Sequence, residues 1–167
     1  MSRVWPIVKT LVFTVIVPGT VAVYLPRRIL LSRTAADLLP LQALRSVGVL
    51  FAAAGALAYL WCAWDFATAG RGTPAPIDPP KELVARGLYR RVRNPMYVGI
   101  ALLLLGEALF FRSRALLFYA GAVFLFFHLF VVFYEEPALR RQFGAEYEAY
   151  CSNVPRWIPR IRPWSGA

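Results

Sequence analysis

Residues 96–134, MYVGIALLLLGEALFFRSRALLFYAGAVFLFFHLFVVFY, decide the fold of this chain, because they hold two apolar segments with almost nothing between them. Residues 96–111 and 115–134 each have the composition of a membrane-spanning helix. The first is short for a crossing, which takes about 20 residues. Only Arg-Ser-Arg separates the two segments, and a connection this short predicts a tight antiparallel helical hairpin.

Two more apolar segments precede the hairpin, at residues 9–25 and 46–66. Pro18 and Gly19 lie in the middle of the first and predict a kink there. The alanines and glycines of the second are small enough for close helix contact. The first segment has the basic start of a signal peptide, but no small-residue cleavage site follows, so we expect a retained helix. We therefore predict an all-α integral membrane protein with about four transmembrane helices.

The composition supports a bilayer as the natural solvent. Of the 167 residues, 59% are hydrophobic and 17% charged, and the mean hydropathy is +0.53. Soluble domains are about half apolar and about a quarter charged. If both termini and residues 67–95 share one side, that side has 13 Lys and Arg residues against 6 on the other. The positive-inside rule then predicts cytoplasmic termini, in the plasma (inner) membrane by our interpretation. The net charge of +10 fits this topology and anionic headgroups without any nucleic acid.

We expect one membrane domain over residues 1–167. Residues 1–66 form two helices, 67–95 a Pro- and Gly-rich cytoplasmic loop, 96–134 the hairpin and 135–167 a cytoplasmic interfacial tail. The loop can be a rigid connector or the lid of a site, and its composition leaves both open. In the tail, apolar residues recur every three or four positions, which predicts an amphipathic helix on the membrane interface. They are Leu139, Phe143, Tyr147 and Tyr150. Trp157, Ile158 and Trp164, which alternate with arginines, predict an interfacial anchor.

The residues before the hairpin predict an anion site at the edge of the membrane. Pro95 suits the first turn of a helix, and Asn94 suits the N-cap before it. The first-turn N–H groups and the helix dipole favour an anion there, and Arg93 adds a planar fork for a carboxylate or phosphate. For Arg90 and Arg91 we favour contacts with lipid phosphates.

The ionisable residues after and within the hairpin also need partners. Glu135 and Glu136 follow a long apolar run, where a carboxylate is costly unless it is paired or faces water. A helix restart explains one of these acids, and the second indicates a paired or ligand-binding role. Glu107 and His128 could pair across the hairpin. The two cysteines have no metal-ligand spacing, so we expect neither a metal site nor a disulfide.

Two sequence elements flank the hairpin, GLYRRVRNPMYVG (87–99) and EEPALRRQFGAEYEAYCSNVPRWIP (135–159). In this order they resemble the integral-membrane methyltransferases that include isoprenylcysteine carboxyl methyltransferase and the phospholipid N-methyltransferases. The family pattern is Gly-x-Tyr, Arg-His-Pro-x-Tyr-x-Gly, a double glutamate, Tyr-x-x-Tyr and a Pro-Arg-x-x-Pro-like end. The match covers about the C-terminal half of the chain. Asn94 stands where the family has histidine, so any acid–base role of that histidine is absent here.

The resemblance implies S-adenosylmethionine as methyl donor and a membrane lipid as acceptor. Arg93 and the helix start would take the methionyl carboxylate, and a glutamate would take the ammonium or the ribose hydroxyls. The implied cofactor-binding residues are Gly87, Tyr89, Arg93, Asn94, Pro95, Tyr97, Gly99, Glu135 and Glu136. The implied catalytic residues are Glu136, Arg93 and Arg156.

The acceptor stays open between two chemistries. We favour an isoprenylcysteine-type carboxylate, on a prenylated small molecule or protein, because a carboxylate needs only alignment with the methyl group. The alternative is a phospholipid amine, which must lose a proton, with Glu136 as the best candidate base. Two other classes also stay open: a membrane reductase that binds NADPH through its arginines, and a non-enzymatic membrane protein.

Overall fold

The computed structural model describes residues 4–32, 43–69, 83 and 85–165. These residues form helices and connections, with no strand among them, which confirms the predicted all-α class. Three helical stretches are long and apolar enough to cross a membrane: Val12–Leu31, Leu44–Asp65 and Arg114–Phe143. The fourth, α4 (Pro95–Phe110), is shorter, as its sequence predicted.

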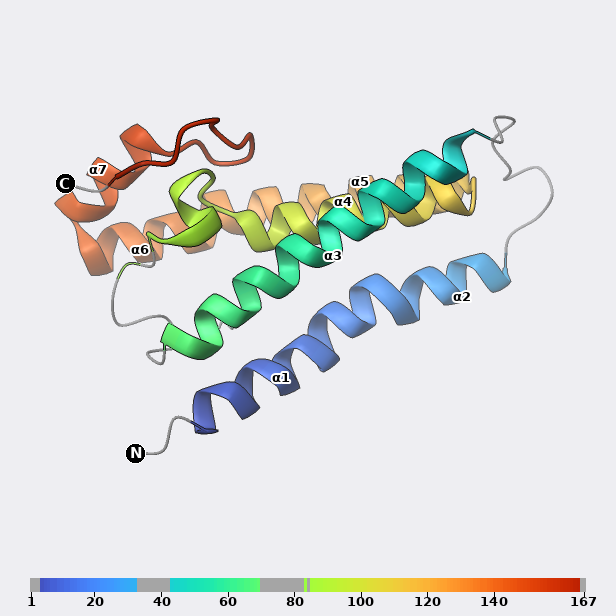
Figure 1. Cartoon of the computed structure of the whole chain (residues 1–167), viewed down its shortest axis with the longest axis horizontal. Helices are drawn as coiled ribbons and strands as arrows, with labels where there is room; N and C mark the ends of the chain where they lie inside the picture. The colour runs from blue at the N-terminus through green and yellow to red at the C-terminus, as the bar shows by residue number, and fades with distance from the viewer. Residues whose placement is uncertain (1–3, 33–42, 70–82, 84, 166–167) are drawn as a thin grey trace.

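The predicted hairpin consists of α4 and α5 (Arg114–Phe130), which run alongside each other (Figure 1). Ser113 ends the connection and caps α5, since its buried hydroxyl accepts a hydrogen bond from the Leu116 N–H at 3.3 Å. Arg112 adopts a left-handed backbone conformation with φ of 55°, which lets the chain reverse within the three residues between the helices. The hairpin prediction is therefore confirmed.

The long helix α3 (Leu44–Ala69) packs against α4 through glycines that face each other in antiparallel order. A Cβ on Gly55 would lie 2.5 Å from the Gly99 carbonyl oxygen, and one on Gly48 would lie 2.7 Å from the Gly106 carbonyl oxygen. These distances are too short for any side chain, so the two backbones touch. The close contact predicted from the small residues of the second segment is thus confirmed, and it fixes α3 against the hairpin.

The N-terminal stretch is one continuous helix made of α1 (Val4–Gly19), a π-helical turn η1 (Thr20–Tyr24) and α2 (Leu25–Leu31). It extends beyond the predicted residues 9–25. Pro18 and Gly19 are the last residues of α1, and the kink expected at them stays a prediction. A second π turn, η4 (Val131–Glu135), joins α5 to α6 (Glu136–Phe143). Each π turn directly precedes a proline-containing helix start, at Pro26 and Pro137. A proline ring clashes with the carbonyl four residues earlier, and the wider π turn relieves that clash.

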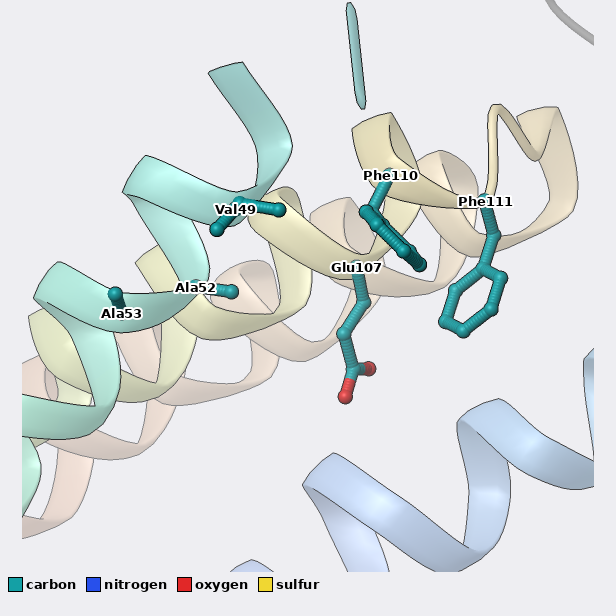
Figure 2. A pocket seen from close by; sticks show the side chains of 6 residues that line it. All are labelled: Val49, Ala52, Ala53, Glu107, Phe110 and Phe111. Carbon is teal, nitrogen blue, oxygen red and sulfur yellow. The ribbon is translucent and has the colours of Figure 1, made fainter. Parts of the chain in front are cut away.

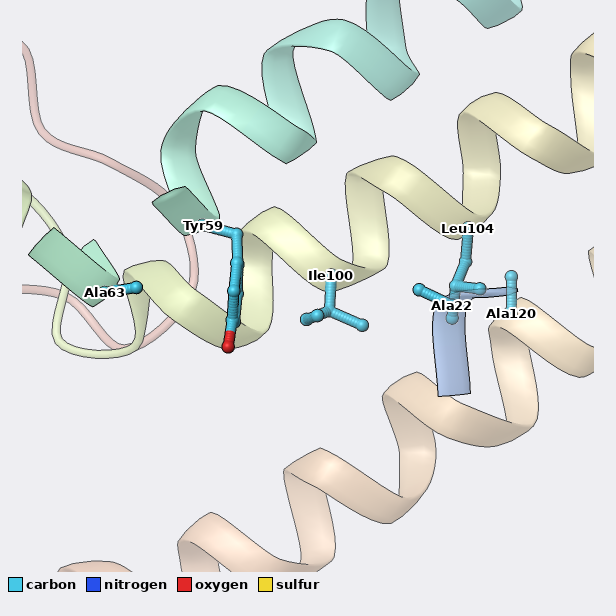
Figure 3. Packing of buried hydrophobic residues seen from close by; sticks show 6 residues of the cluster. All are labelled: Ala22, Tyr59, Ala63, Ile100, Leu104 and Ala120. Atoms are coloured by element: carbon cyan, nitrogen blue, oxygen red, sulfur yellow. The ribbon is translucent and has the colours of Figure 1, made fainter. Parts of the chain in front are cut away.

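The four long helices meet in an apolar core that Figure 3 shows from close by. Its buried members are Ala22, Tyr59, Ala63, Ile100, Leu104 and Ala120. Two side-chain hydrogen bonds also connect the N-terminal helix to α3 and α5. The Tyr59 and Thr14 hydroxyls lie 2.9 Å apart, and the Tyr119 hydroxyl donates to the Val21 carbonyl at 2.8 Å.

The tail contains two short helices, α6 and α7 (Ala145–Asn153), rather than the single helix we predicted. Gly144, with φ of 51°, separates them, because this left-handed conformation ends a helix. The apolar residues of the tail form a second core around the buried Tyr147, Tyr150 and Val154. The prediction that this apolar face lies on the membrane interface is therefore wrong, because the protein itself covers it.

One end of the bundle collects the ends of α3 and α5, the start of α4 and both tail helices (Figure 1). The 3-10 turn η3 (Gly87–Arg90) lies at the same end. This is the end that the distribution of Lys and Arg assigned to the cytoplasm. The loop residues 70–82 and 84, considered above as a connector or a lid, lie outside the described residues.

Candidate functional site

The tail and the segment before α4 are joined by backbone hydrogen bonds. The Arg93 N–H donates to the Pro155 carbonyl, the Arg160 N–H to the Arg91 carbonyl and the Trp164 N–H to the Arg90 carbonyl, each at 2.9 Å. Residues distant in sequence are thereby fixed next to each other at the start of α4. The two sequence elements that carry the family resemblance therefore build one site.

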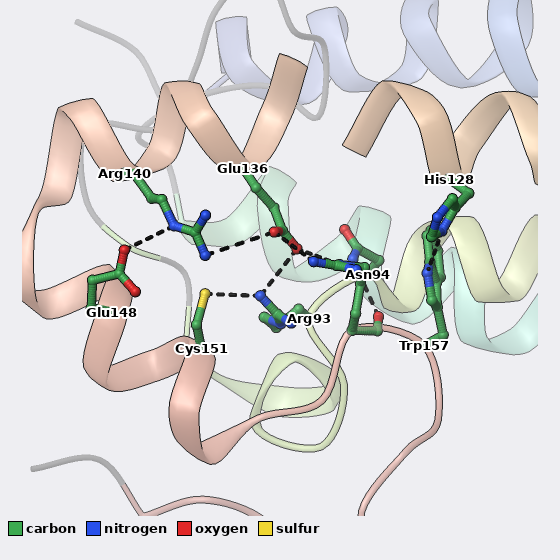
Figure 4. A network of polar contacts seen from close by, with 9 residues as sticks. Arg93, Asn94, His128, Glu136, Arg140, Glu148, Cys151 and Trp157 are labelled. Atoms are coloured by element: carbon green, nitrogen blue, oxygen red, sulfur yellow. Dashed lines mark hydrogen bonds and ion pairs between the residues drawn. The ribbon is translucent and has the colours of Figure 1, made fainter. Parts of the chain in front are cut away.

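Glu136 is the centre of a buried ion-pair network (Figure 4). Arg156 donates to both of its carboxylate oxygens, at 2.6 and 2.9 Å, which is the bidentate geometry that makes such pairs strong. The Arg93 Nη1 lies 3.0 Å from Oε1 of the same carboxylate, and the Arg140 Nη2 lies 4.0 Å from Oε2. The Glu136 side chain is only 3% exposed. The resemblance implied three catalytic residues, Glu136, Arg93 and Arg156. The structure brings them together, with both arginines bound to the glutamate.

Asn94 precedes α4 as predicted, but its side chain does not cap the helix. Its amide nitrogen donates instead to the Arg156 carbonyl at 3.2 Å. The predicted side-chain cap is therefore wrong, because the tail offers a competing acceptor. As a result, the side chain leaves the first-turn N–H groups of α4 available. The residue before Asn94 is Arg93, whose buried Nε has no hydrogen-bond partner among the described residues.

Glu135 has different surroundings from its neighbour Glu136. Its Oε2 accepts a hydrogen bond from the Tyr97 hydroxyl at 2.9 Å, and the residue is half-buried. No described arginine or lysine forms an ion pair with it. The Tyr97 ring packs against Phe127 with centroids 4.7 Å apart. One carboxylate is thus neutralised by arginines, and the adjacent one lies among aromatic rings.

Tyr89 belongs to the surroundings of Glu135. Its backbone carbonyl accepts a hydrogen bond from the Tyr150 hydroxyl at 2.6 Å, which fixes η3 on the tail. Burial raises the pKa of the Tyr89 phenol well above its usual range, and the nearby Cys62 thiol and Glu135 carboxyl raise it further. Tyr89, Tyr97 and Glu135, all predicted site residues, therefore gather in one place.

The structure adds Asp65, which the sequence analysis did not single out, to this region. A Cβ on Gly87 would collide with the Asp65 carboxylate, and Gly87 has a left-handed φ of 55° that favours glycine. Arg86 also donates to the Asp65 backbone carbonyl at 2.5 Å. The available signal was an acid near the end of an apolar helix, in WCAWDF at residues 61–66.

Two predicted site residues have a packing role in this structure. Gly99 lies in the close contact between α3 and α4, where a Cβ would be 2.9 Å from the Gly55 carbonyl oxygen. Pro95 is buried at the first turn of α4. Their assignment to a cofactor remains a prediction.

The predicted pairing of Glu107 with His128 is wrong. The His128 Nδ1 accepts a hydrogen bond from the Trp157 indole N–H at 3.1 Å (Figure 4). Glu107 lies near the C-terminal end of α4, just before the hairpin turn. The turn brings the start of α5 next to Glu107, whereas His128 lies near the end of α5. There it lines an apolar pocket of about 320 Å³ (Figure 2). The other lining residues are Val49, Ala52, Ala53, Phe110 and Phe111.

The part of the chain that the structure describes contains both cysteines and other possible metal ligands. No group of three or more His, Cys, Asp or Glu side chains that could hold a metal ion occurs among them. Cys62 and Cys151 are free cysteines, and the Cys151 sulfur accepts a hydrogen bond from Arg93 at 2.8 Å.

The fold and the site define an α-helical membrane protein with a charged and aromatic site at one end of its helices. A sequence profile of the phospholipid methyltransferase family matches residues 44–146, and the chain belongs to this family. No curated protein matches the chain closely. The resemblance drawn from the two flanking elements is confirmed, and the chain is a membrane methyltransferase for lipid-like substrates. The reductase and non-enzymatic alternatives find no support in this match.

Proposed function

We propose that this protein transfers a methyl group from S-adenosylmethionine to the amine headgroup of a phospholipid, at the site formed by Tyr89, Tyr97 and Glu135. The observation that carries the proposal is the contrast between Glu135 and Glu136. Glu136 is bound by Arg93 and Arg156, whereas Glu135 has only the Tyr97 hydroxyl as a described hydrogen-bond partner.

The residues at the start of α4 suit the carboxylate of the methyl donor. The helix of 16 residues presents first-turn N–H groups that the Asn94 side chain does not cap. Arg93 directly precedes this helix start in sequence, and its Nε is buried and unpartnered among the described residues. A carboxylate bound there would satisfy both features, while Nη1 of Arg93 keeps its contact with Glu136. When bound, S-adenosylmethionine supplies an electrophilic methyl group attached to a positively charged sulfur.

Glu135 suits a protonated amine acceptor. An ammonium group is attracted to a carboxylate that has no other cation, and it must lose a proton before its nitrogen can attack a methyl group. The Tyr97 hydroxyl holds Oε2, so Oε1 remains to accept that proton. The Phe127 ring against Tyr97 restricts the orientation of the phenol and hence of the carboxylate. In this proposal Glu135 replaces Glu136 as the candidate base.

The carboxylate acceptor favoured in the sequence analysis has less support. A prenylcysteine carboxylate needs a cation to hold it. Arg156 is bound to Glu136, and in this proposal Arg93 already serves both Glu136 and the carboxylate of the methyl donor. Next to Glu135 a second carboxylate would be repelled. The description of the family as phospholipid methyltransferases supports the amine as well.

A labelled-methyl assay tests this proposal. Purified protein in detergent would receive S-adenosylmethionine with a radioactive methyl group, together with either phosphatidylethanolamine or farnesylcysteine. We expect label in phosphatidylethanolamine, and a loss of about 100-fold or more in Glu135→Gln, the order expected for a general base. Glu148→Gln is the matched control, because Glu148 is 59% exposed and its ion pair is with the exposed Arg140.

Three outcomes would contradict the proposal in different ways. Label in farnesylcysteine alone would return the acceptor to the carboxylate class. Methyl transfer by Glu135→Gln at the wild-type rate would show that Glu135 is not the base. Calorimetric binding of NADPH, with no binding of S-adenosylmethionine, would remove the donor.

A further inference from the structure

We propose that the tail loop, residues 155–163, inserts into the headgroup layer of the membrane and binds anionic phospholipids there. This inference concerns a surface outside the methyl-transfer site and does not depend on which acceptor is methylated. It rests on three features of the tail loop: where its apolar side chains point, where it lies along α5, and which charges surround it.

The tail loop directs its isoleucines outward while the neighbouring tryptophans point inward. Trp157 donates to His128 and packs edge-on against Phe124 with ring centroids 5.1 Å apart. Ile158 and Ile161 are 79% and 90% exposed, among the highest values of any apolar side chain in the described chain. Of the residues predicted as interfacial anchors, Ile158 is the one that is exposed, and Ile161 joins it on the surface.

The contacts of Trp157 place the tail loop beside the membrane-spanning part of α5. Phe124 and His128 precede Glu136 by 12 and 8 residues, which correspond to about 18 and 12 Å along a helix. Both lie inside the apolar stretch Arg114–Phe143. Figure 4 shows the Trp157 side chain directed at His128 of this helix. Isoleucines exposed at this depth face lipid rather than bulk water.

The surroundings of the tail loop are strongly basic. The guanidinium groups of Arg90, Arg91 and Arg160 donate to backbone carbonyls of the tail. A carbonyl carries no net charge, so these bonds orient the arginines without neutralising them. Arg162 is exposed, and none of the four forms an ion pair with a described residue. An anionic lipid headgroup would supply the negative charge that these arginines lack. Each arginine near such a surface increases the binding affinity by about fivefold.

Depth-dependent quenching tests the insertion. Ile158→Cys and Ile161→Cys would be prepared in the full chain with Cys151→Ser, leaving the buried Cys62, and labelled with the fluorophore NBD. The matched control is Ser152→Cys, on the exposed face of α7. In phosphatidylcholine liposomes with one fifth phosphatidylglycerol, we expect lipids carrying a shallow nitroxide to quench NBD at 158 and 161 severalfold more than at 152. Equal quenching at all three positions overturns the insertion.

The lipid preference has its own comparison. Removal of phosphatidylglycerol should reduce quenching at 158 and 161. Arg160→Gln with Arg162→Gln should reduce it to the same level in the presence of phosphatidylglycerol. Quenching that is identical with and without phosphatidylglycerol overturns the anionic partner. Thermal unfolding of each labelled protein shows whether it is folded. Relative to Cys151→Ser alone, we expect unchanged melting temperatures for the substitutions at the exposed positions 152, 158 and 161.

Discussion

Replacing Glu136 by glutamine should destabilise the protein far more than removing the arginine at the edge of the same network. The glutamine keeps the size of the side chain and one acceptor oxygen, but it removes the charge that Arg156 binds at 2.6 and 2.9 Å and Arg93 at 3.0 Å. Both guanidinium groups would then be left without their anion. Arg93 is the more affected, because its side chain is 12% exposed, against 31% for Arg156.

The magnitude follows from these exposures. Breaking a buried pair by removing one partner costs about 3–5 kcal/mol. Arg156 can regain some water, so we expect Glu136→Gln to cost about 3 kcal/mol, near the lower limit of that range. Arg140→Gln removes a group that is 44% exposed and 4.0 Å from Glu136. Such a surface pair contributes about 0–1 kcal/mol.

Thermal unfolding in detergent measures this difference. At about 2–4 °C per kcal/mol, Glu136→Gln should lower the melting temperature by roughly 6–12 °C and Arg140→Gln by less than about 4 °C. The double variant with Arg156→Gln should cost less than the sum of the single variants, because it removes the unpaired cation as well. Equal and small shifts for Glu136→Gln and Arg140→Gln would refute the assignment of Glu136 as the centre of the network.

Three further changes test other parts of the structure. Gly55→Ala should destabilise the protein by about 1–3 kcal/mol, because the added methyl group meets the backbone of α4. Gly121→Ala should be neutral or stabilising, because a Cβ at Gly121 would meet nothing within 4 Å. Thermal unfolding measures both variants, and equal effects would contradict the close contact of α3 and α4. Tyr97→Phe removes only the hydroxyl that holds Glu135. It should reduce methyl transfer by at least about tenfold and lower the stability by about 1–3 kcal/mol. Unchanged transfer would argue against a role for the Tyr97–Glu135 hydrogen bond. Glu107→Leu should raise the melting temperature, because it removes a buried carboxylate oxygen that lacks a described hydrogen-bond partner. It should leave methyl transfer unchanged. A loss of transfer would indicate that the pocket lined by Glu107 takes part in the reaction.

The helices could be predicted from the sequence because local features define them. The hairpin follows from two apolar segments with three residues between them, and α4 starts at Pro95, where the sequence indicated a helix start. The contact of α3 with α4 follows from their glycines and alanines. The estimated depth of Glu107 was wrong because the reversal at Ser113 aligns the end of α4 with the start of α5, not with His128.

The partners within the site could not be predicted, because they depend on contacts between distant parts of the chain. The Asn94 side chain bonds to the Arg156 carbonyl, 62 positions later, instead of capping its own helix. The spacing of Tyr147 and Tyr150 showed that the tail has an apolar face but not what covers it. The sequence placed Glu135 and Glu136 in the site, yet only the structure assigns one to the arginines and the other to Tyr97.

The π turn η4, Val131–Glu135, sets the rotational phase between the lipid-facing part of its helix and the part that carries the two glutamates. A π turn is a local bulge that accommodates one residue more than the α-helical turn it replaces. Deleting one residue from it would leave a regular α-helix and rotate α5 relative to Glu135 and Glu136 by about 100°. Exposed side chains of α5, such as Phe118 and Phe126, would then turn away from the lipid while the glutamates kept their partners. Apolar substitutions within this turn should therefore be tolerated, whereas single-residue deletions there should not be.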